Sequence, residues 1–181
     1  AMLAGTLIAV RVVNIPGFLN KQREFIDGKD LNRYMPGKEK GLACEIYNHF
    51  ITKKIIKHFD YLLDLHTASF GRENCLYIRG DLDNPVCKKL AYLQNPNIIV
   101  NKFDEEGTLR AWANSVGIAG ITIEIGNPHT FQRKLIDNTL DGILNTLRYL
   151  KMIEGEVRDY MGEATICESS SWIYSYTGGV I

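Results

Sequence analysis

The chain has 181 residues, of which 45% are hydrophobic and 23% charged, and its formal net charge is +0 at pH 7. This length suits one well-buried domain and is short for two. Because positive and negative charges balance and no apolar run approaches the length of a membrane span, we expect neither nucleic acid nor a membrane as a partner.

The first half of the chain predicts two strands with a long loop and a helix between them. Residues 6–13 are β-branched and nearly all apolar, as in a strand buried on both faces. Residues 20–40 are polar and contain several glycines, which predicts a long ordered loop with a functional role. Residues 41–59 show helical spacing with one wide buried face, and residues 61–66 form a short apolar strand. The apolar positions of the expected helix are Leu42, Ile46, Tyr47, Phe50, Ile51, Ile55 and Phe59.

The second half of the chain alternates short apolar runs with helical patterns. The expected strands are residues 76–79, 98–100 and 120–125, and the expected helices are residues 86–94, 108–116 and 131–153. Strands that alternate with helices predict an α/β fold with a mostly parallel, mixed sheet covered by helices on both faces.

The cysteines indicate a compartment. Cys44, Cys75, Cys87 and Cys167 are widely separated and form no Cys-x-x-Cys pair. A chain of this size with a full supply of apolar residues does not need disulfides, so we expect a reducing cytoplasm.

His66 is a candidate metal ligand at the end of the strand 61–66. Asp64 lies two residues earlier, so both side chains point to the same face of a strand. A carboxylate beside a metal-binding imidazole can fix its tautomer from the second coordination shell. A histidine that only makes a hydrogen bond at a strand end is the commoner case, and the spacing alone favours it. Cys75 with His66 as its base is a weaker, nucleophilic alternative.

Glu124 is a candidate proton carrier in the strand 120–125. Its isoleucine neighbours face one way and Glu124 the other. A carboxylate at the end of an apolar strand is costly to bury alone, which favours general acid and base chemistry. A structural carboxylate paired with a nearby arginine or lysine explains the pattern equally well.

Arg23, Asn32 and Arg33 share the polar loop 20–40. An arginine binds a carboxylate through two parallel hydrogen bonds, and an asparagine adds a neutral donor beside it. A solvated loop with ordinary surface charges is the alternative for the Asn-Arg pair. Arg72 and Arg79 are weaker candidates for the same kind of site.

Taken in order, segments spread over nearly the whole chain resemble the succinylglutamate desuccinylase/aspartoacylase family, a branch of the zinc carboxypeptidase-like hydrolases. They are Gly5–Val10, Val13-Asn14, Asp30–Arg33, Pro36-Gly37, Asp64–Ala68, Gly71-Arg72, Tyr77–Arg79, Gly107–Arg110 and Thr122–Pro128. The resemblance implies a zinc carboxypeptidase-like fold, one zinc ion as cofactor, and hydrolysis of the amide bond in a small N-acylated amino acid or amine.

The resemblance also implies a role for each candidate. His66 resembles the third zinc ligand, and Glu124 the carboxylate that activates water and then protonates the leaving amine. Asn32 and Arg33 resemble the clamp on the substrate carboxylate, and Arg23 the arginine that steadies the tetrahedral oxyanion.

The family's first two zinc ligands come from a His-x-x-Glu motif, which this sequence does not contain. We therefore expect a chain truncated at both ends and inactive in this form, lacking the first strand of the fold. Residues 3–165 would form a partial catalytic core and residues 166–181 the start of a C-terminal β segment. A carboxypeptidase-like metallopeptidase and a metal-free, non-catalytic remnant are the alternatives. A missing strand would expose a sheet edge, which makes a second copy of the chain a candidate partner.

Overall fold

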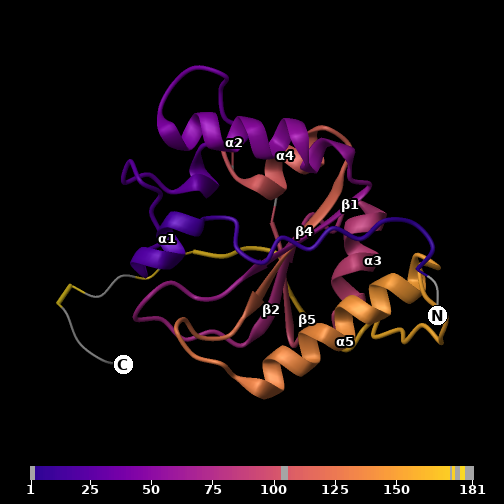
Figure 1. Ribbon diagram of the computed structural model, residues 1–181. Helices are drawn as coiled ribbons and strands as arrows, with labels where there is room; N and C mark the ends of the chain where they lie inside the picture. Colours follow the sequence, from indigo (N-terminus) through magenta and orange to yellow (C-terminus); the bar gives the residue numbers. More distant parts are fainter. Residues whose placement is uncertain (1–2, 103–105, 172, 174–175, 178–181) are drawn as a thin grey trace.

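The computed structural model describes residues 3–102, 106–171, 173, 176 and 177. Figure 1 shows a sheet with helices packed against it. In chain order the elements are α1 (Ile15–Asn20), η1 (Leu31–Arg33), α2 (Ala43–Lys54), η2 (Ile56–His58), β1 (Tyr61–His66), β2 (Leu76–Gly80), α3 (Pro85–Leu93), β3 (Ile98–Asn101), α4 (Leu109–Ser115), β4 (Ala119–Ile125), α5 (Arg133–Tyr149) and β5 (Thr165–Cys167).

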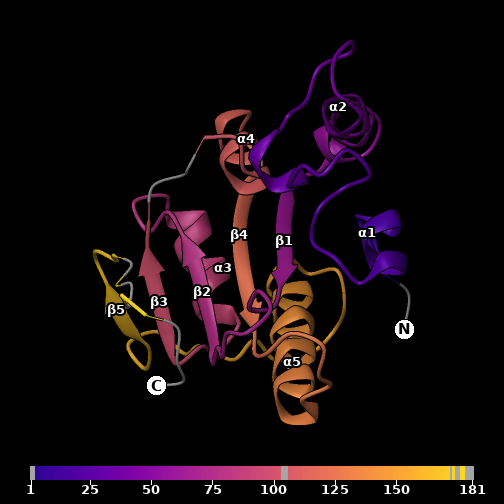
Figure 2. The same cartoon turned by 90° about the vertical axis from the view of Figure 1, so that its left-hand side faces the viewer.

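The five strands form one mixed sheet in the order β1-β4-β2-β3-β5 (Figure 2). β4 pairs in parallel with β1 and antiparallel with β2, and the pairs β2–β3 and β3–β5 are parallel. This is the predicted α/β architecture with a mostly parallel, mixed sheet. β1 forms one edge of the sheet, since β4 is its only neighbour among the described strands.

Alternation along the strands separates an apolar face of the sheet from a polar one. Ile121 and Ile123 of β4 are fully buried in the main core, together with Ile78 of β2 and residues of α3. α3 and α5 cover this apolar face, whereas α4 packs against β1 and β4 at the amino end of the opposite face. The carboxyl-terminal half of that opposite face carries the polar side chains.

Most predicted elements are confirmed, with shifted ends. β1 has the predicted bounds, and the helix predicted over 131–153 forms over the shorter range Arg133–Tyr149. Three short elements were not predicted: α1, β5 and η1, the last of which forms within the predicted loop 20–40. α1 begins at Ile15 because Pro16 suits a first helical turn and Asn14 caps it, and the three-residue strand β5 is too short for a pattern to reveal.

The strand predicted over residues 6–13 is wrong. The segment runs without regular structure, and Leu7, Ile8 and Val10 are each about half exposed, at 52%, 50% and 51%. Main-chain hydrogen bonds hold the segment near its two ends: Ala4 N donates to the Met152 carbonyl, and the Val13 carbonyl accepts from the Tyr47 hydroxyl. A β-branched sequence becomes a strand only where a neighbouring strand offers hydrogen bonds.

The predicted buried face of the helix over 41–59 is also wrong in part. Leu42 and Phe50 are 45% and 52% exposed, while Asn48 and Thr52 of α2 are almost fully buried. The reason is that this side of α2 packs on the polar main chain of the loop 20–40. Asn48 donates to the Leu31 carbonyl at 2.8 Å and Thr52 to the Pro36 carbonyl at 3.0 Å. α2 thus covers the main chain of the loop 20–40, whose carbonyl groups need donors.

Candidate functional site

Three adjacent strands place six side chains in a two-row grid on the polar face of the sheet. His66 of β1 pairs with Glu124 of β4, which pairs with Tyr77 of β2. The second row is Asp64, Thr122 and Arg79. Because paired residues share a face, strand register alone brings His66 and Glu124 together although 58 residues separate them in sequence.

The His66 imidazole is held from its own strand. Its Nε2 lies 2.9 Å from Asp64 Oδ2, and both side chains are mostly buried, at 21% and 13% exposed. Burial opposes the charged imidazolium and lowers the pKa of His66. The hydrogen bond and negative charge of Asp64 act in the other direction and prevail, so the pKa of His66 lies above its ordinary value.

Glu124 is 8% exposed and lies between two polar neighbours. Arg79 Nε is 3.7 Å from Glu124 Oε1, and Asn74 Nδ2 donates to Glu124 Oε2 at 3.4 Å. Arg79 in turn donates to the Tyr77 hydroxyl from Nε at 3.2 Å. The sequence left open whether Glu124 is a structural carboxylate paired with an arginine or a proton carrier. The ion pair is present, and Glu124 still lines a cavity, so one carboxylate combines both features.

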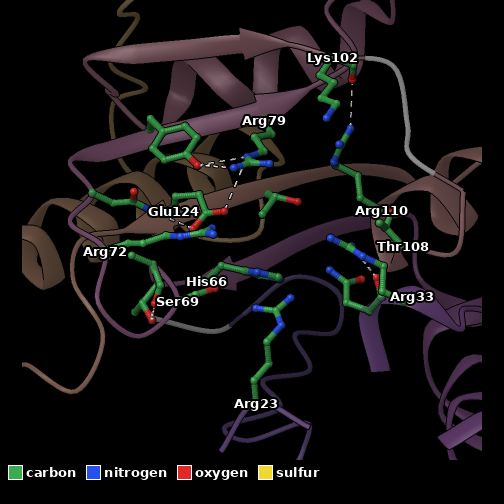
Figure 3. A pocket seen from close by; sticks show the side chains of 16 residues that line it. Arg23, Arg33, His66, Ser69, Arg72, Arg79, Lys102, Thr108, Arg110 and Glu124 are labelled. Carbon is green, nitrogen blue, oxygen red and sulfur yellow. Dashed lines mark hydrogen bonds and ion pairs between the residues drawn. The ribbon is translucent and has the colours of Figure 1, made fainter. Parts of the chain in front are cut away.

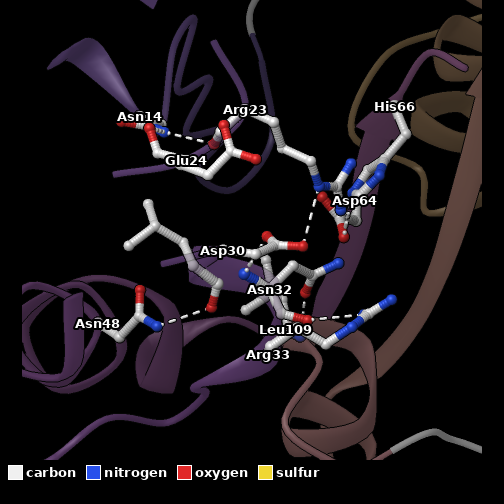
Figure 4. A network of polar contacts seen from close by, with 11 residues as sticks. Asn14, Arg23, Glu24, Asp30, Asn32, Arg33, Asn48, Asp64, His66 and Leu109 are labelled. Atoms are coloured by element: carbon white, nitrogen blue, oxygen red, sulfur yellow. Dashed lines mark hydrogen bonds and ion pairs between the residues drawn. The ribbon is translucent and has the colours of Figure 1, made fainter. Parts of the chain in front are cut away.

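The loop 20–40 places the other predicted residues opposite the sheet (Figure 4). Arg23 Nε pairs with Asp30 Oδ2 at 2.9 Å. Asn32 Oδ1 accepts from the backbone N–H of Leu109 at 2.7 Å. Arg33 is exposed and donates from Nη1 to the adjacent Asn32 carbonyl at 2.9 Å.

A cavity of about 150 Å³ collects all five predicted site residues (Figure 3). Arg23, Asn32, Arg33, His66 and Glu124 line it together with Thr67, Ala68, Ser69, Arg72, Asn74, Tyr77, Arg79, Lys102, Thr108, Arg110 and Thr122. Five of these side chains are arginines and one is a lysine, whereas Glu124 is the one carboxylate among them. A confined cavity with this excess of positive charge favours an anionic ligand.

Sequence reasoning missed part of this lining. Arg110 was not considered, although Gly107–Arg110 belongs to the resemblance, and Arg72 and Arg79 were ranked low. For Arg79 a signal was available. Arg79 and Tyr77 are two residues apart in β2, so both lie on the face of the sheet that carries Glu124. The signal depends on knowing that β2 runs antiparallel to β4, and that could not be read from the chain.

The described residues do not by themselves supply a catalytic zinc site. Among residues 3–102, 106–171, 173, 176 and 177, no group of three or more His, Cys, Asp or Glu side chains could hold a metal ion. His66 and Glu124 face the cavity, but a catalytic zinc takes three protein ligands. The described part of the chain therefore supplies at most one imidazole and one carboxylate towards such a site, which is fewer than the three ligands that a catalytic zinc takes.

One known domain family matches most of the chain. Residues 1–150 match the sequence profile of the succinylglutamate desuccinylase/aspartoacylase catalytic domain. No curated protein matches the chain closely enough to count as a relative. None of the described helices has the length and apolar character needed to traverse a bilayer.

Solved structures share the fold at low sequence identity. A succinylglutamate desuccinylase/aspartoacylase from Rhodobacter sphaeroides is 23% identical, with a TM-score of 0.72 over 84% of this chain and 47% of that one. The product-bound ectoine utilization protein EutE (DoeB) from Ruegeria pomeroyi is 19% identical, with a TM-score of 0.75 over 85% and 49%. The succinylglutamate desuccinylase from Chromobacterium violaceum is 14% identical, with a TM-score of 0.67 over 93% and 60%. The chain spans about half the length of the first two.

Proposed function

Because the chain belongs to the succinylglutamate desuccinylase/aspartoacylase family, we propose that the protein hydrolyses the amide bond of a small N-acylated amino acid or amine that carries a carboxylate. The observation that carries this proposal is the cavity, in which one buried carboxylate, Glu124, faces a ring of arginines. An amide hydrolase needs a group that moves protons and donors for negative charge. This cavity contains both.

In the proposed reaction Glu124 accepts a proton from the attacking water and gives it to the leaving amine. Asn74 and Arg79 hold the two carboxylate oxygens in place. Arg23 is poised to stabilise the negative oxygen of the tetrahedral intermediate, and Asp30 fixes its orientation at 2.9 Å. Arg33, with its exposed guanidinium at the cavity, binds the substrate carboxylate.

We propose zinc as the cofactor of the active form, with His66 as one ligand and the remaining ligands outside these 181 residues. Asp64 supports this role for His66, since a carboxylate commonly orients a metal-binding imidazole. Alone, the chain should bind zinc weakly, because affinity depends on the number of preorganised ligands. Metal analysis of protein purified without added zinc should find well under one equivalent. A stoichiometric zinc that survives dialysis would contradict this prediction.

The experiment that tests the function compares substrates. A form of the protein that includes the flanking sequence is incubated with a panel of N-acyl amino acids and with short peptides that have free carboxyl termini. Release of the free amino acid from the N-acyl compounds supports the deacylase. Cleavage of peptides alone would replace it with a carboxypeptidase-like metallopeptidase, and activity on neither panel would favour a non-catalytic carboxylate-binding protein.

We also propose that the 181-residue chain self-associates in the cytoplasm through β1. Natural proteins protect a strand at the edge of a sheet with charge, proline or a bulge. β1 lies at the sheet edge, and Leu65 and Tyr61 are 50% and 41% exposed. Size-exclusion chromatography coupled to light scattering over a range of concentrations should detect a dimer, and a Leu65→Lys variant should shift it towards monomer. A monomer at all concentrations would contradict self-association.

A further inference from the structure

The turn Asp30–Arg33 contacts three other parts of the chain. Asp30 fixes Arg23 through the 2.9 Å ion pair, and its other carboxylate oxygen accepts from the backbone N–H of Asn32 at 2.9 Å. The Leu31 carbonyl accepts from buried Asn48 of α2. Asn32 then accepts from Leu109 N, and Arg33 extends its own side chain to the cavity (Figure 4).

The contact between Asn32 and Leu109 attaches the first turn of α4 to the loop 20–40. Leu109 is the first residue of α4, and a helix leaves its first N–H groups without partners inside the helix. Thr108 accepts from the Ala111 N–H at 3.2 Å, as an N-cap does, while Asn32 accepts from Leu109 N–H at 2.7 Å across 77 residues of sequence. Arg110, the next residue, is 5% exposed and lines the cavity.

A close backbone approach accompanies this hydrogen bond. Met35 N donates to the Gly107 carbonyl at 2.9 Å. Gly107 has a φ of +83°, and a Cβ atom built on it would lie 2.5 Å from the Arg33 carbonyl oxygen. Any larger residue must therefore push the two loops apart, and this would shift the backbone of Arg33 away from the loop that leads to Arg110.

From these contacts we infer that Asp30, Asn32 and Gly107 form one positioning device, which holds the Arg23 guanidinium and the backbone that carries Arg33 and Arg110 in place around the cavity before an anion binds. The inference rests on the proposed function, because it takes the cavity to be the site of an anionic substrate. Three like charges repel each other, so they stay together only where other contacts hold them. A site whose donors are already ordered loses less entropy on binding.

Asn32 is thus a positioning residue through its side-chain oxygen Oδ1. Its side-chain nitrogen Nδ2 is the atom that remains for a substrate. Asn32→Asp keeps an acceptor for Leu109 N–H, whereas Asn32→Ala removes it. The amide hydrogen of Leu109 should therefore exchange with solvent much faster in Asn32→Ala than in Asn32→Asp. A residue that only contacts substrate would leave this exchange unchanged in both variants.

Gly107→Ala tests the device without changing any side chain that lines the cavity. Gly117→Ala is the matched control, since Gly117 has a φ of +87° and nothing lies within 4 Å of the position a Cβ would take. Both variants carry the same kind of backbone strain, but only Gly107→Ala separates the loops. Calorimetric titration of the 181-residue chain with succinate, a dicarboxylate without an amide bond, measures anion affinity independently of hydrolysis.

We expect the Gly117→Ala control to bind succinate as the unmodified chain does, and Gly107→Ala to bind at least about tenfold more weakly, a change of about 1.4 kcal/mol. Unchanged affinity in Gly107→Ala would overturn the inference, as would an unmodified chain that binds no succinate. If Gly107→Ala does not fold, the Leu109 exchange in the two Asn32 variants decides instead. Binding that follows the expected order without deacylation by any form would overturn the proposed function and leave the positioning device in place.

Discussion

The cavity has two walls that are held in different ways. On the sheet side, His66 and Glu124 occupy paired positions of adjacent strands, and the whole ladder of main-chain hydrogen bonds fixes their relative place. On the loop side, Arg23 and Arg33 are placed by single side-chain contacts, with Asp30 and Asn32 at the centre. The difference predicts that His66 and Glu124 lose their relative position only when the core unfolds. Arg23 and Arg33, by contrast, can each be displaced by the loss of one contact.

The largest effect should come from the core beneath the sheet wall. Ile123 precedes Glu124, points to the opposite face and is fully buried. Ile123→Ala leaves a cavity in the core and should lower the free energy of unfolding by roughly 2–5 kcal/mol. Urea titration measures this loss. Leu140→Ala is the control, because Leu140 on α5 is 51% exposed and should change stability by about 0.5 kcal/mol or less.

Glu124→Gln tests the chemistry of the sheet wall without disturbing its packing. Glutamine keeps the size of the side chain but cannot accept the proton, so kcat of an active form should fall on the order of a hundredfold or more. Substrate affinity should change little, since the amide still fills the same place. Steady-state kinetics with metal analysis distinguish the two effects. Near-normal turnover would assign the proton transfer to another group.

Arg33→Ala tests the loop wall. Loss of one charge-assisted contact should weaken the binding of carboxylate-bearing substrates by roughly 1.5–3 kcal/mol, which appears as a higher KM. Amides without a carboxylate should be affected much less. The free energy of unfolding should change by about 0.5 kcal/mol or less, because Arg33 is exposed and, within the described part of the chain, its guanidinium bonds to its neighbour's carbonyl. The kinetics are compared on both substrate classes beside a thermal melt. Equal losses on both classes would show that Arg33 serves the loop and does not read the substrate.

Asp64→Asn should give the smallest effect, and one that depends on pH. Asp64 raises the pKa of His66 above 6.5, so the pair stabilises the folded chain most fully below the unfolded pKa, and this stabilisation is lost as pH rises through the folded pKa. The variant should therefore lose on the order of 1 kcal/mol at about pH 5.5 and less at about pH 9. Thermal melts at both pH values measure this loss, with Asp141→Asn, at an exposed position of α5, as the control. A loss of stability that does not vary with pH would mean that His66 and Asp64 do not form an ion pair.

The same contrast explains what the sequence could predict. β1 is a short apolar run that ends in polar residues, and the alternation of β4 places Glu124 opposite its isoleucines without any knowledge of the fold. The resemblance added the candidate roles of Arg23, Asn32 and Arg33, and the structure brings all three to one cavity with His66 and Glu124. Their catalytic, substrate and metal roles stay predictions, as does the division of the chain at residue 165.

What the sequence could not predict depends on partners far along the chain. The pattern of residues 6–13 is typical of a strand, yet it carries no information on whether a neighbouring strand is present. α2 was misread for a similar reason, because Asn48 and Thr52 look like surface residues until the loop carbonyls that they bind are placed against them. Arg110 was missed because its position depends on a hydrogen bond that spans 77 residues.

The exposed segment at residues 3–13 also has a consequence for handling the protein. Proteases cut where an extended, exposed backbone can enter their active site, and this segment offers an exposed arginine, Arg11, in such a stretch. Brief trypsin treatment of the native chain should therefore cleave after Arg11 before it reaches the buried Arg110. The trimmed product would keep every strand of the sheet, and the order of these two cuts gives a rapid assay of whether a variant is still folded.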